Sequence, residues 1–181
     1  MGLGSAMAGG NSSEGRVEDD FYPTPHGVTQ ALLKIVSFRG VIHEPCCGDG
    51  AMTRVLEDAG HKVVASDINP RGSGVARDFF TITKPVGHNI VTNPPFKIAV
   101  RMIEHGLTLN PQVMAMVLKS TFWHARNRRD LFERTQPAMI CPLLWRPDFL
   151  GLGRPTMEVM WCIWKKGHTG PPSYHLLPKP E

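Results

Sequence analysis

The segment VTNPPF, at Val91–Phe96, brings together groups that could bind a planar amine. Proline has no backbone N–H to donate to a sheet, so the strand that leads into Pro94 must end there. The side-chain oxygen of Asn93 and the carbonyl of Pro94 are two acceptors, and the paired prolines hold that carbonyl rigidly. Phe96 adds a ring face for stacking. The candidate catalytic residues are therefore Asn93, Pro94, Pro95 and Phe96, with a simple Asn-Pro-Pro turn as the alternative.

A second candidate site lies in HEPCCGDG, where a glycine-bearing loop follows a short apolar strand. Gly48 and Gly50 allow tight turning and a close approach of the backbone to a ligand. Asp67 ends the next strand, where nucleotide-binding α/β proteins place an acid on the ribose hydroxyls. The alternatives are an ordinary turn at the glycines and a capping role for Asp67 in the turn that follows it.

The same loop limits which cofactor it could hold. It has no lysine and no G-K-[ST], which argues against a triphosphate, and it lacks the third glycine of the dinucleotide motif. S-adenosylmethionine carries a ribose but no phosphates, so it needs no phosphate cradle. These residues therefore favour S-adenosylmethionine.

Strands and helices alternate along the chain and predict where these groups meet. The pattern predicts an α/β fold: a Rossmann-like doubly wound sheet, mostly parallel, with a C-terminal antiparallel hairpin strand. Ligands of such sheets bind outside the carboxyl ends of the strands, so the loops after Glu44, Asp67, Asp78 and Asn93 should share one edge. The predicted strands are 41–44, 61–67, 88–93, 112–119, 138–143 and 157–165; the predicted helices are 52–59, 97–109 and 121–134, with a loop at 68–77.

Several motifs follow one another in a familiar order: FYPTP at Phe21–Pro25, EPCCGDG at Glu44–Gly50, Asp67, DFF at Asp78–Phe80 and NPPF at Asn93–Phe96. Together they resemble the class I S-adenosylmethionine-dependent methyltransferases. More narrowly, they resemble the short phage and prophage enzymes that methylate adenine N6 in DNA. The resemblance covers about residues 20–165.

The resemblance implies a role for each matching residue. Asp67 would bind the ribose hydroxyls, Asp78 would accept from the adenine amino group of the cofactor, and Phe79 would pack on that ring. The interval from Asp67 to Asp78 is short for the family, so the wall under the cofactor adenine is expected to differ. The implied cofactor-binding residues are Phe21, Tyr22, Thr24, Glu44, Cys46, Gly48, Asp67, Ile68, Asp78, Phe79 and Asn93.

The NPPF match implies methyl transfer to the exocyclic N6 amine of an adenine flipped out of DNA. That nitrogen is a poor nucleophile because its lone pair is delocalised into the ring. Asn93 and the Pro94 carbonyl would bind both of its hydrogens and favour sp³ geometry, while Phe96 would stack on the base. The proton can leave after methyl transfer, which explains why the motif contains no His, Asp or Lys.

Basic residues near the predicted edge could track phosphates. One group lies on the predicted helix 121–134, for which a solvated helix face is the alternative. Only the tail 167–181 follows the predicted catalytic domain, so we expect no separate target-recognition domain and little sequence specificity. The candidate nucleic-acid-binding residues are Arg126, Arg128, Arg129, Arg146 and Arg154.

Composition sets broad bounds on the protein. The formal charge of +4 is compatible with a polyanionic partner. No apolar run approaches the ~18 residues of a membrane span, so we expect no membrane partner. The four cysteines lack C-x-x-C spacing and the histidines lack metal-ligand spacing, so we expect reduced thiols in a cytoplasmic protein and no metal. The predicted domains are a disordered arm at 1–19, a methyltransferase catalytic domain at 20–166 and an irregular tail at 167–181.

Three other functions remain open. The first is an RNA adenine or guanine N-methyltransferase, because several of these also use N-P-P-F. The second is a protein glutamine N-methyltransferase, in which N-P-P-Y is more usual. The third is a catalytically silent methyltransferase fold that binds nucleic acid or a partner subunit. DNA is therefore the expected partner and RNA the second.

Overall fold

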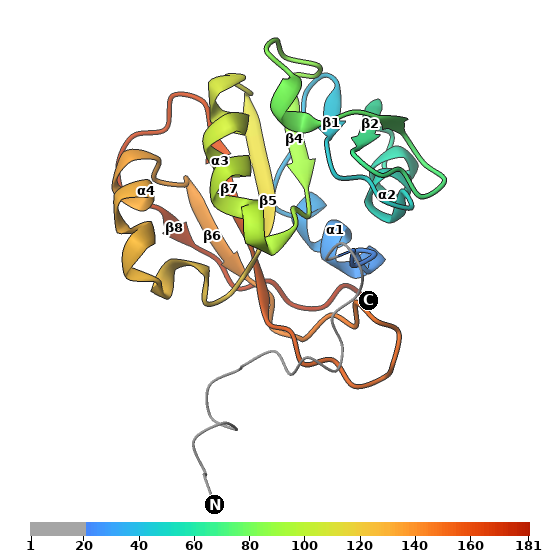
Figure 1. The fold of residues 1–181 in the computed structure, drawn as a ribbon. Coiled ribbons are helices and arrows are strands. Elements are labelled where there is room, and N and C mark those ends of the chain that lie inside the picture. The colour runs from blue at the N-terminus through green and yellow to red at the C-terminus, as the bar shows by residue number, and fades with distance from the viewer. Residues whose placement is uncertain (1–20) are drawn as a thin grey trace, which may run out of the picture.

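The computed structural model describes residues 21–181, and the predicted arm at 1–19 lies outside the described residues. Eight strands of the described part form one mixed sheet in the order β3-β2-β1-β4-β5-β7-β6-β8 (Figure 1). The strands are β1 (Ile42–Glu44), β2 (Val63–Asp67), β3 (Val75–Ala76), β4 (Asn89–Thr92), β5 (Val113–Lys119), β6 (Met139–Pro142), β7 (Val159–Lys165) and β8 (Ser173–Tyr174).

The direction of the strands changes once β7 is reached. Neighbouring strands from β3 to β5 are all parallel. β7 then runs antiparallel to both β5 and β6, while β8 is parallel to β6. This confirms the predicted Rossmann-like sheet, mostly parallel, with an antiparallel hairpin strand near the C-terminus.

Strand β5 shows how the sequence builds both faces of the sheet. Its residues from Met114 to Leu118 are completely buried. Ala115 and Val117 belong to one core cluster, whereas Met114, Met116 and Leu118 belong to the other. Successive side chains of a strand point to opposite faces, so a strand covered on both faces must be apolar throughout.

Helices cover the two faces (Figure 1). α1 (His26–Leu33) and α2 (Ala51–Asp58) bury Leu32 and Leu56 in the first cluster. α3 (Ala99–Thr108) and α4 (Arg129–Arg134) bury Ile103 and Leu131 in the second. Short 3₁₀ turns lie at Phe79–Thr81, Phe96–Ile98, Phe122–His124 and Arg126–Arg128.

The predicted helix at 121–134 is wrong as one continuous element. Two 3₁₀ turns precede the short helix α4. Ala125 between the turns is extended, with φ −92° and ψ 125°, and this interrupts the helical hydrogen bonds. The apolar side chain of Phe122 is buried at this point, so tertiary packing decides the path of a segment whose composition favours a helix.

Three further elements differ from the sequence-based expectations. Helix α1 was not predicted, because its sequence HGVTQALL is short and contains a glycine and a threonine. Strand β3 lies inside the predicted loop 68–77. The tail, predicted to be irregular, contributes β8 and buries Leu177 in the first core cluster.

The topology brings the predicted site residues to one edge. The carboxyl ends of β1, β2, β4, β5 and β6 all lie at this edge, because these strands point the same way. The C-terminus also ends here, beside α1 (Figure 1), where Pro180 lies near Gly27. No helix in residues 21–181 is long and apolar enough to cross a membrane.

Candidate active site

A cavity opens at this edge, between the N-terminal segment at 21–24 and the loops that follow β1, β2 and β4. The structure therefore brings together four motifs that are far apart in the sequence. Predicted residues that line the cavity are Phe21, Tyr22, Thr24, Glu44, Cys46, Asp67, Ile68, Asn93, Pro94, Pro95 and Phe96. Lining residues that were not predicted are Pro23, Cys47, Asp49, Ala51, Met52, Asn69 and Arg71.

Asn93 is held by the N-terminal segment. Its Nδ2 donates to the Thr24 hydroxyl at 3.1 Å and to the Tyr22 carbonyl at 3.4 Å. A backbone carbonyl can only accept, so these contacts fix which end of the amide faces Tyr22. The orientation of the Asn93 amide is therefore set by a segment that lies far earlier in the chain.

The opposite end of this amide has no partner. Asn93 Oδ1 is buried and accepts no hydrogen bond from residues 21–181. Within residues 21–181, six buried side-chain N or O atoms lack a hydrogen-bond partner. Of the six residues that carry these atoms, only Asn93 lines the cavity. A buried acceptor without a donor costs about 1–3 kcal/mol, so a ligand that brought a donor to this atom would stabilise the site.

Aromatic rings form the wall beside Asn93. The centroids of Tyr22 and Phe96 are 6.5 Å apart, with the ring planes inclined by 32°. Tyr22 also meets Phe149 edge-on at 6.4 Å, and Lys119 Nζ lies 5.0 Å from the centroid of Phe96. Phe149 and Lys119 come from the β6–β7 loop and the end of β5. Neither belongs to a recognisable motif, so the sequence carried no signal for their proximity.

Asp67 organises the glycine loop. Its Oδ2 accepts from the Gly48 backbone N–H at 2.9 Å, and its Oδ1 accepts from the Asn69 N–H at 2.8 Å. Asp67 therefore caps the turn that follows it, which was the alternative to a cofactor-binding role. Each carboxylate oxygen can accept more than one hydrogen bond, so both oxygens keep capacity for ribose hydroxyls.

Both the backbone conformation at position 48 and the nearby Phe21 ring require a glycine there. Its φ is +52°, in the left-handed region that side chains disfavour. A Cβ at this position would lie 2.3 Å from the Phe21 ring. The Phe21 ring in turn carries the Arg71 guanidinium at 4.6 Å from its centroid. The loop and the N-terminal segment therefore pack directly on each other.

Glu44 is an acid buried under the cavity. It is 2% exposed, and its Oε2 accepts from the Thr53 hydroxyl on α2. Burial raises the pKa of Glu44 to about 8, an effect that the Thr53 hydrogen bond opposes and that nearby Asp49 and Asp67 reinforce. Glu44 is thus poised to hold a proton near neutral pH and to release it when a cation approaches.

The two adjacent cysteines are unreactive thiols. Burial raises the pKa of Cys46 to about 12 and that of Cys47 to about 12. The Cys47 thiol donates to the Ser73 carbonyl at 3.2 Å. The thiolate is the nucleophilic form, so these side chains line the site without offering a nucleophile.

Three predicted cofactor residues lie outside the cavity lining: Gly48, Asp78 and Phe79. Asp78 Oδ1 accepts from the Phe80 N–H at 2.9 Å and caps the 3₁₀ turn that follows. Phe79 is 4% exposed, with its ring edge-on to His105 at 4.9 Å in the second core cluster. The Phe79 ring thus packs on α3, and its contact with a cofactor adenine stays a prediction.

Some of the basic residues predicted to bind nucleic acid make contacts within the protein. Arg128 donates to the Phe122 carbonyl at 2.5 Å and stacks on its ring at 4.2 Å. Arg129 pairs with Glu133 at 2.7 Å. Arg126, Arg146 and Arg154 are exposed, and Arg146 pairs with Glu158.

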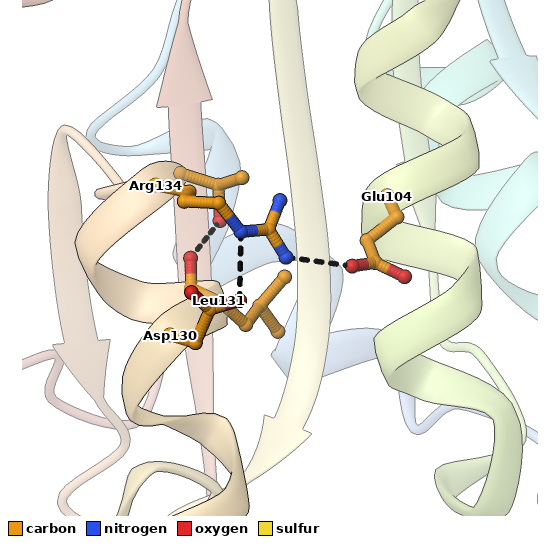
Figure 2. A network of polar contacts seen from close by, with 5 residues as sticks. Glu104, Asp130, Leu131 and Arg134 are labelled. Carbon is orange, nitrogen blue, oxygen red and sulfur yellow. Dashed lines mark hydrogen bonds and ion pairs between the residues drawn. The ribbon is translucent and has the colours of Figure 1, made fainter.

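Arg134 joins α4 to α3. It bonds Asp130 on its own helix at 2.8 Å and Glu104 on α3 at 3.0 Å (Figure 2). This pairing indicates that the far end of the basic segment serves the packing of helices.

In residues 21–181, no group of three or more His, Cys, Asp or Glu side chains could hold a metal ion.

No family model and no curated protein matches the chain, but solved structures do. PH1948 of Pyrococcus horikoshii, a candidate RNA methyltransferase, matches with a TM-score of 0.62 and 12% identity over 80% of this chain and 86% of that one. The candidate class I S-adenosylmethionine-dependent methyltransferase lmo1582 of Listeria monocytogenes matches with a TM-score of 0.60 and 12% identity, over 90% of this chain and 67% of that one. A dimethyladenosine transferase from Plasmodium falciparum matches with a TM-score of 0.59 and 14% identity, over 80% of this chain and 62% of that one.

The chain has a Rossmann-like methyltransferase fold. At identities of 12–14%, this likeness establishes the fold and leaves the chemistry to be argued from the site. Within this methyltransferase fold, the cavity lies outside the carboxyl ends of the parallel strands, where such sheets bind their ligands.

Proposed function

We propose that the protein transfers a methyl group from S-adenosylmethionine to the exocyclic N6 amine of a flipped adenine in DNA. The observation that carries this proposal is the buried, unpartnered Oδ1 of Asn93 in a cavity walled by Tyr22 and Phe96. An acceptor beside ring faces is the recognition chemistry of a planar aromatic amine.

The residues of the site fit this cofactor. S-adenosylmethionine has a cationic amino group, a ribose diol and no phosphates, and it supplies an electrophilic methyl group. Glu44 is a buried acid that an ammonium group would ionise, and Asp67 retains acceptor capacity for two hydroxyls. Phe21 and Thr24 would close the methionine end. We also propose that Asp78 accepts from the amino group of the cofactor adenine. Its Oδ1 already accepts from the Phe80 N–H, so the other carboxylate oxygen would make this contact.

The reaction needs positioning more than proton transfer. Asn93 Oδ1 accepts one N–H of the substrate amine and the Pro94 carbonyl accepts the other, which favours sp³ geometry at nitrogen. Bound S-adenosylmethionine would supply the methyl group and its sulfur would keep the electron pair of the methyl–sulfur bond, while the amine proton would leave the nitrogen for solvent. The Thr24 and Tyr22 contacts keep the Asn93 amide from turning its Nδ2 toward the substrate.

A planar base suits the wall better than a glutamine amide. The rings of Tyr22 and Phe96 both belong to residues that line the cavity beside Asn93, and a flipped base can stack on aromatic rings. An aliphatic amide would leave these rings uncovered. The motif resemblance points to DNA, whereas the likeness to PH1948 favours RNA as the second candidate substrate.

A side-by-side transfer assay tests the proposal. Labelled S-adenosylmethionine is incubated with DNA, RNA and a protein mixture, and digested products are identified by mass spectrometry. We expect N6-methyladenine in DNA. Methyl label confined to RNA or protein would refute the DNA assignment, and no transfer to any acceptor would refute the activity.

Asn93→Ala is the matched control. It should reduce transfer by about 10² or more while S-adenosylmethionine affinity stays within a few fold, the scale seen when a preorganised polar group is removed. A normal rate in this variant would show that the proposed mechanism is wrong.

A further inference from the structure

The loop between β6 and β7, residues 143–158, projects from the edge of the sheet that holds the cavity. It is drawn in orange beside α1 in Figure 1. Its tip exposes Leu150 at 43% and Leu152 at 69%. Exposed leucines are common singly, but two at one loop tip beside a candidate active site call for a physical explanation.

The tip has a defined shape. Asp148 accepts from the Gly153 N–H at 2.6 Å and from the Leu152 N–H at 3.2 Å. Gly151 and Gly153 have φ of +66° and +68°, and nothing lies within 4 Å of a Cβ added to either. These glycines are therefore required by the backbone turn alone, and the turn holds both leucines toward solvent.

The base of the loop is fixed as well. Arg146 donates through Nε and Nη2 to the same carboxylate oxygen of Glu158, at 3.1 and 2.6 Å, which ties the two ends of the tip together. Phe149, next to the exposed Leu150, is 6% exposed and packs against Tyr22, whose ring also meets Phe96. The tip is thus anchored directly to the wall of the candidate active site.

We propose that Leu150 and Leu152 form an apolar wedge that enters the base stack of duplex DNA at the position of the target adenine. This rests on the proposed function and adds how the base is taken from its helix. A base that leaves the duplex leaves an apolar gap between its neighbours, and leucine is one of the side chains that proteins insert between base steps. Arg154, exposed next to the tip, suits the adjacent phosphates.

A duplex suits this tip better than a protein surface. A stable protein interface buries about 1,000 Å² or more, far beyond the reach of two leucine side chains on a narrow turn. A base step needs only a small apolar group held in one position. The Asp148 cap, the Arg146–Glu158 pair and the contact of Phe149 with Tyr22 favour one conformation of the tip.

The test compares a paired adenine with the same adenine in single-stranded DNA. The variant is Leu150→Ala/Leu152→Ala, and the matched control is Leu176→Ala, an exposed leucine on the tail. A wedge is needed only when a base must leave a helix. We therefore expect the variant to lose about tenfold or more of its rate on duplex and to stay within about twofold on single strands. The control should match the wild type on both.

A second readout is independent of methyl transfer. With 2-aminopurine at the target position of a duplex, the wild type should raise its fluorescence on binding and the double variant should not. Asp148→Ala, which releases the turn without removing the leucines, should lower the duplex rate in the same direction.

The outcomes separate the two proposals. Wild-type transfer to adenine N6 in single-stranded DNA establishes the methyl transfer whatever the variant does, and a wild type that methylates single strands but not duplex would overturn the wedge. Given that activity, equal losses on duplex and single strand, or no loss on either, would overturn the wedge alone. No transfer by the wild type to any DNA would overturn both.

Discussion

Replacing the buried Glu44 by glutamine should change how the stability of the protein depends on pH. Glu44 has an ordinary pKa of 4.5, and burial raises the pKa to about 8 in the folded protein. The folded chain therefore binds more protons than the unfolded chain between these values. Stability contributed by the protonated form is complete below pH 4.5 and is lost as pH rises through 8.

His43 acts in the opposite direction over a lower range. Burial, with a smaller effect of Arg77, lowers the pKa of His43 from 6.5 to about 4. Its neutral form is favoured in the fold, so stability rises with pH from 4 to 6.5 and is then constant. Between pH 4.5 and 6.5, Glu44 and His43 change the free energy of unfolding in opposite directions, and the two changes largely cancel. Above pH 6.5, the change due to Glu44 remains.

The window from pH 6.5 to 8 therefore isolates Glu44. One proton difference changes the free energy of unfolding by about 1.4 kcal/mol per pH unit, so the wild type should lose roughly 2 kcal/mol across this window. The thiols, with an ordinary pKa of 9.0, contribute little below pH 8. Glu44→Gln cannot titrate, and its amide oxygen can still accept from Thr53, so its stability should stay nearly level.

Urea denaturation at several pH values across this window measures the difference. Glu57→Gln is the matched control, because Glu57 is an exposed acid on the same helix as Thr53 and should leave the wild-type slope unchanged. A wild type whose stability is level across the window, or a Glu44→Gln protein that falls as steeply as the wild type, would refute the reasoning.

Three further changes test the site. Thr24→Val should lower methyl transfer at saturating S-adenosylmethionine by about tenfold, because the Asn93 amide loses its better acceptor, and Thr24→Ser should restore the rate; equal rates in all three proteins would remove Thr24 from the positioning of Asn93. Asp67→Ala should weaken S-adenosylmethionine binding in calorimetry by roughly tenfold to a hundredfold, and unchanged affinity with an intact fold would exclude Asp67 from the cofactor site. Phe96→Ala should weaken substrate use more than Phe96→Tyr, as measured by KM, because a stacked ring is worth about 1–3 kcal/mol; identical KM values would rule out stacking.

The sequence predicted the sheet because its strands carry strong local signals. β5 and β7 are continuous apolar runs, and both are buried on their two faces. The order of strands and helices then placed the motif residues at one edge, since parallel strands end together. This is why Glu44, Asp67 and Asn93 could be expected to line one cavity, whereas Thr24 was expected there only from the family resemblance.

Features that depend on tertiary contacts were not predictable in this way. The helix expected at 121–134 is broken where Phe122 enters the core. The side chain of Phe79 turns to α3, although its motif position implied a cofactor contact. Phe149 reaches Tyr22 only because β6 and β7 pair antiparallel and return their loop to the edge of the sheet. No local pattern encodes these three outcomes.

Tyr22 is the point at which these separate elements meet. Its carbonyl accepts from Asn93, while its ring contacts both Phe96 and Phe149. A shift of this residue would therefore move the acceptor amide, the stacking wall and the anchor of the β6–β7 loop together. Because packed side chains respond to displacement as a unit, a duplex pressing on the loop tip and a base entering the cavity would act on the same residue. That shared contact gives a physical reason why target entry and the orientation of Asn93 should be coupled.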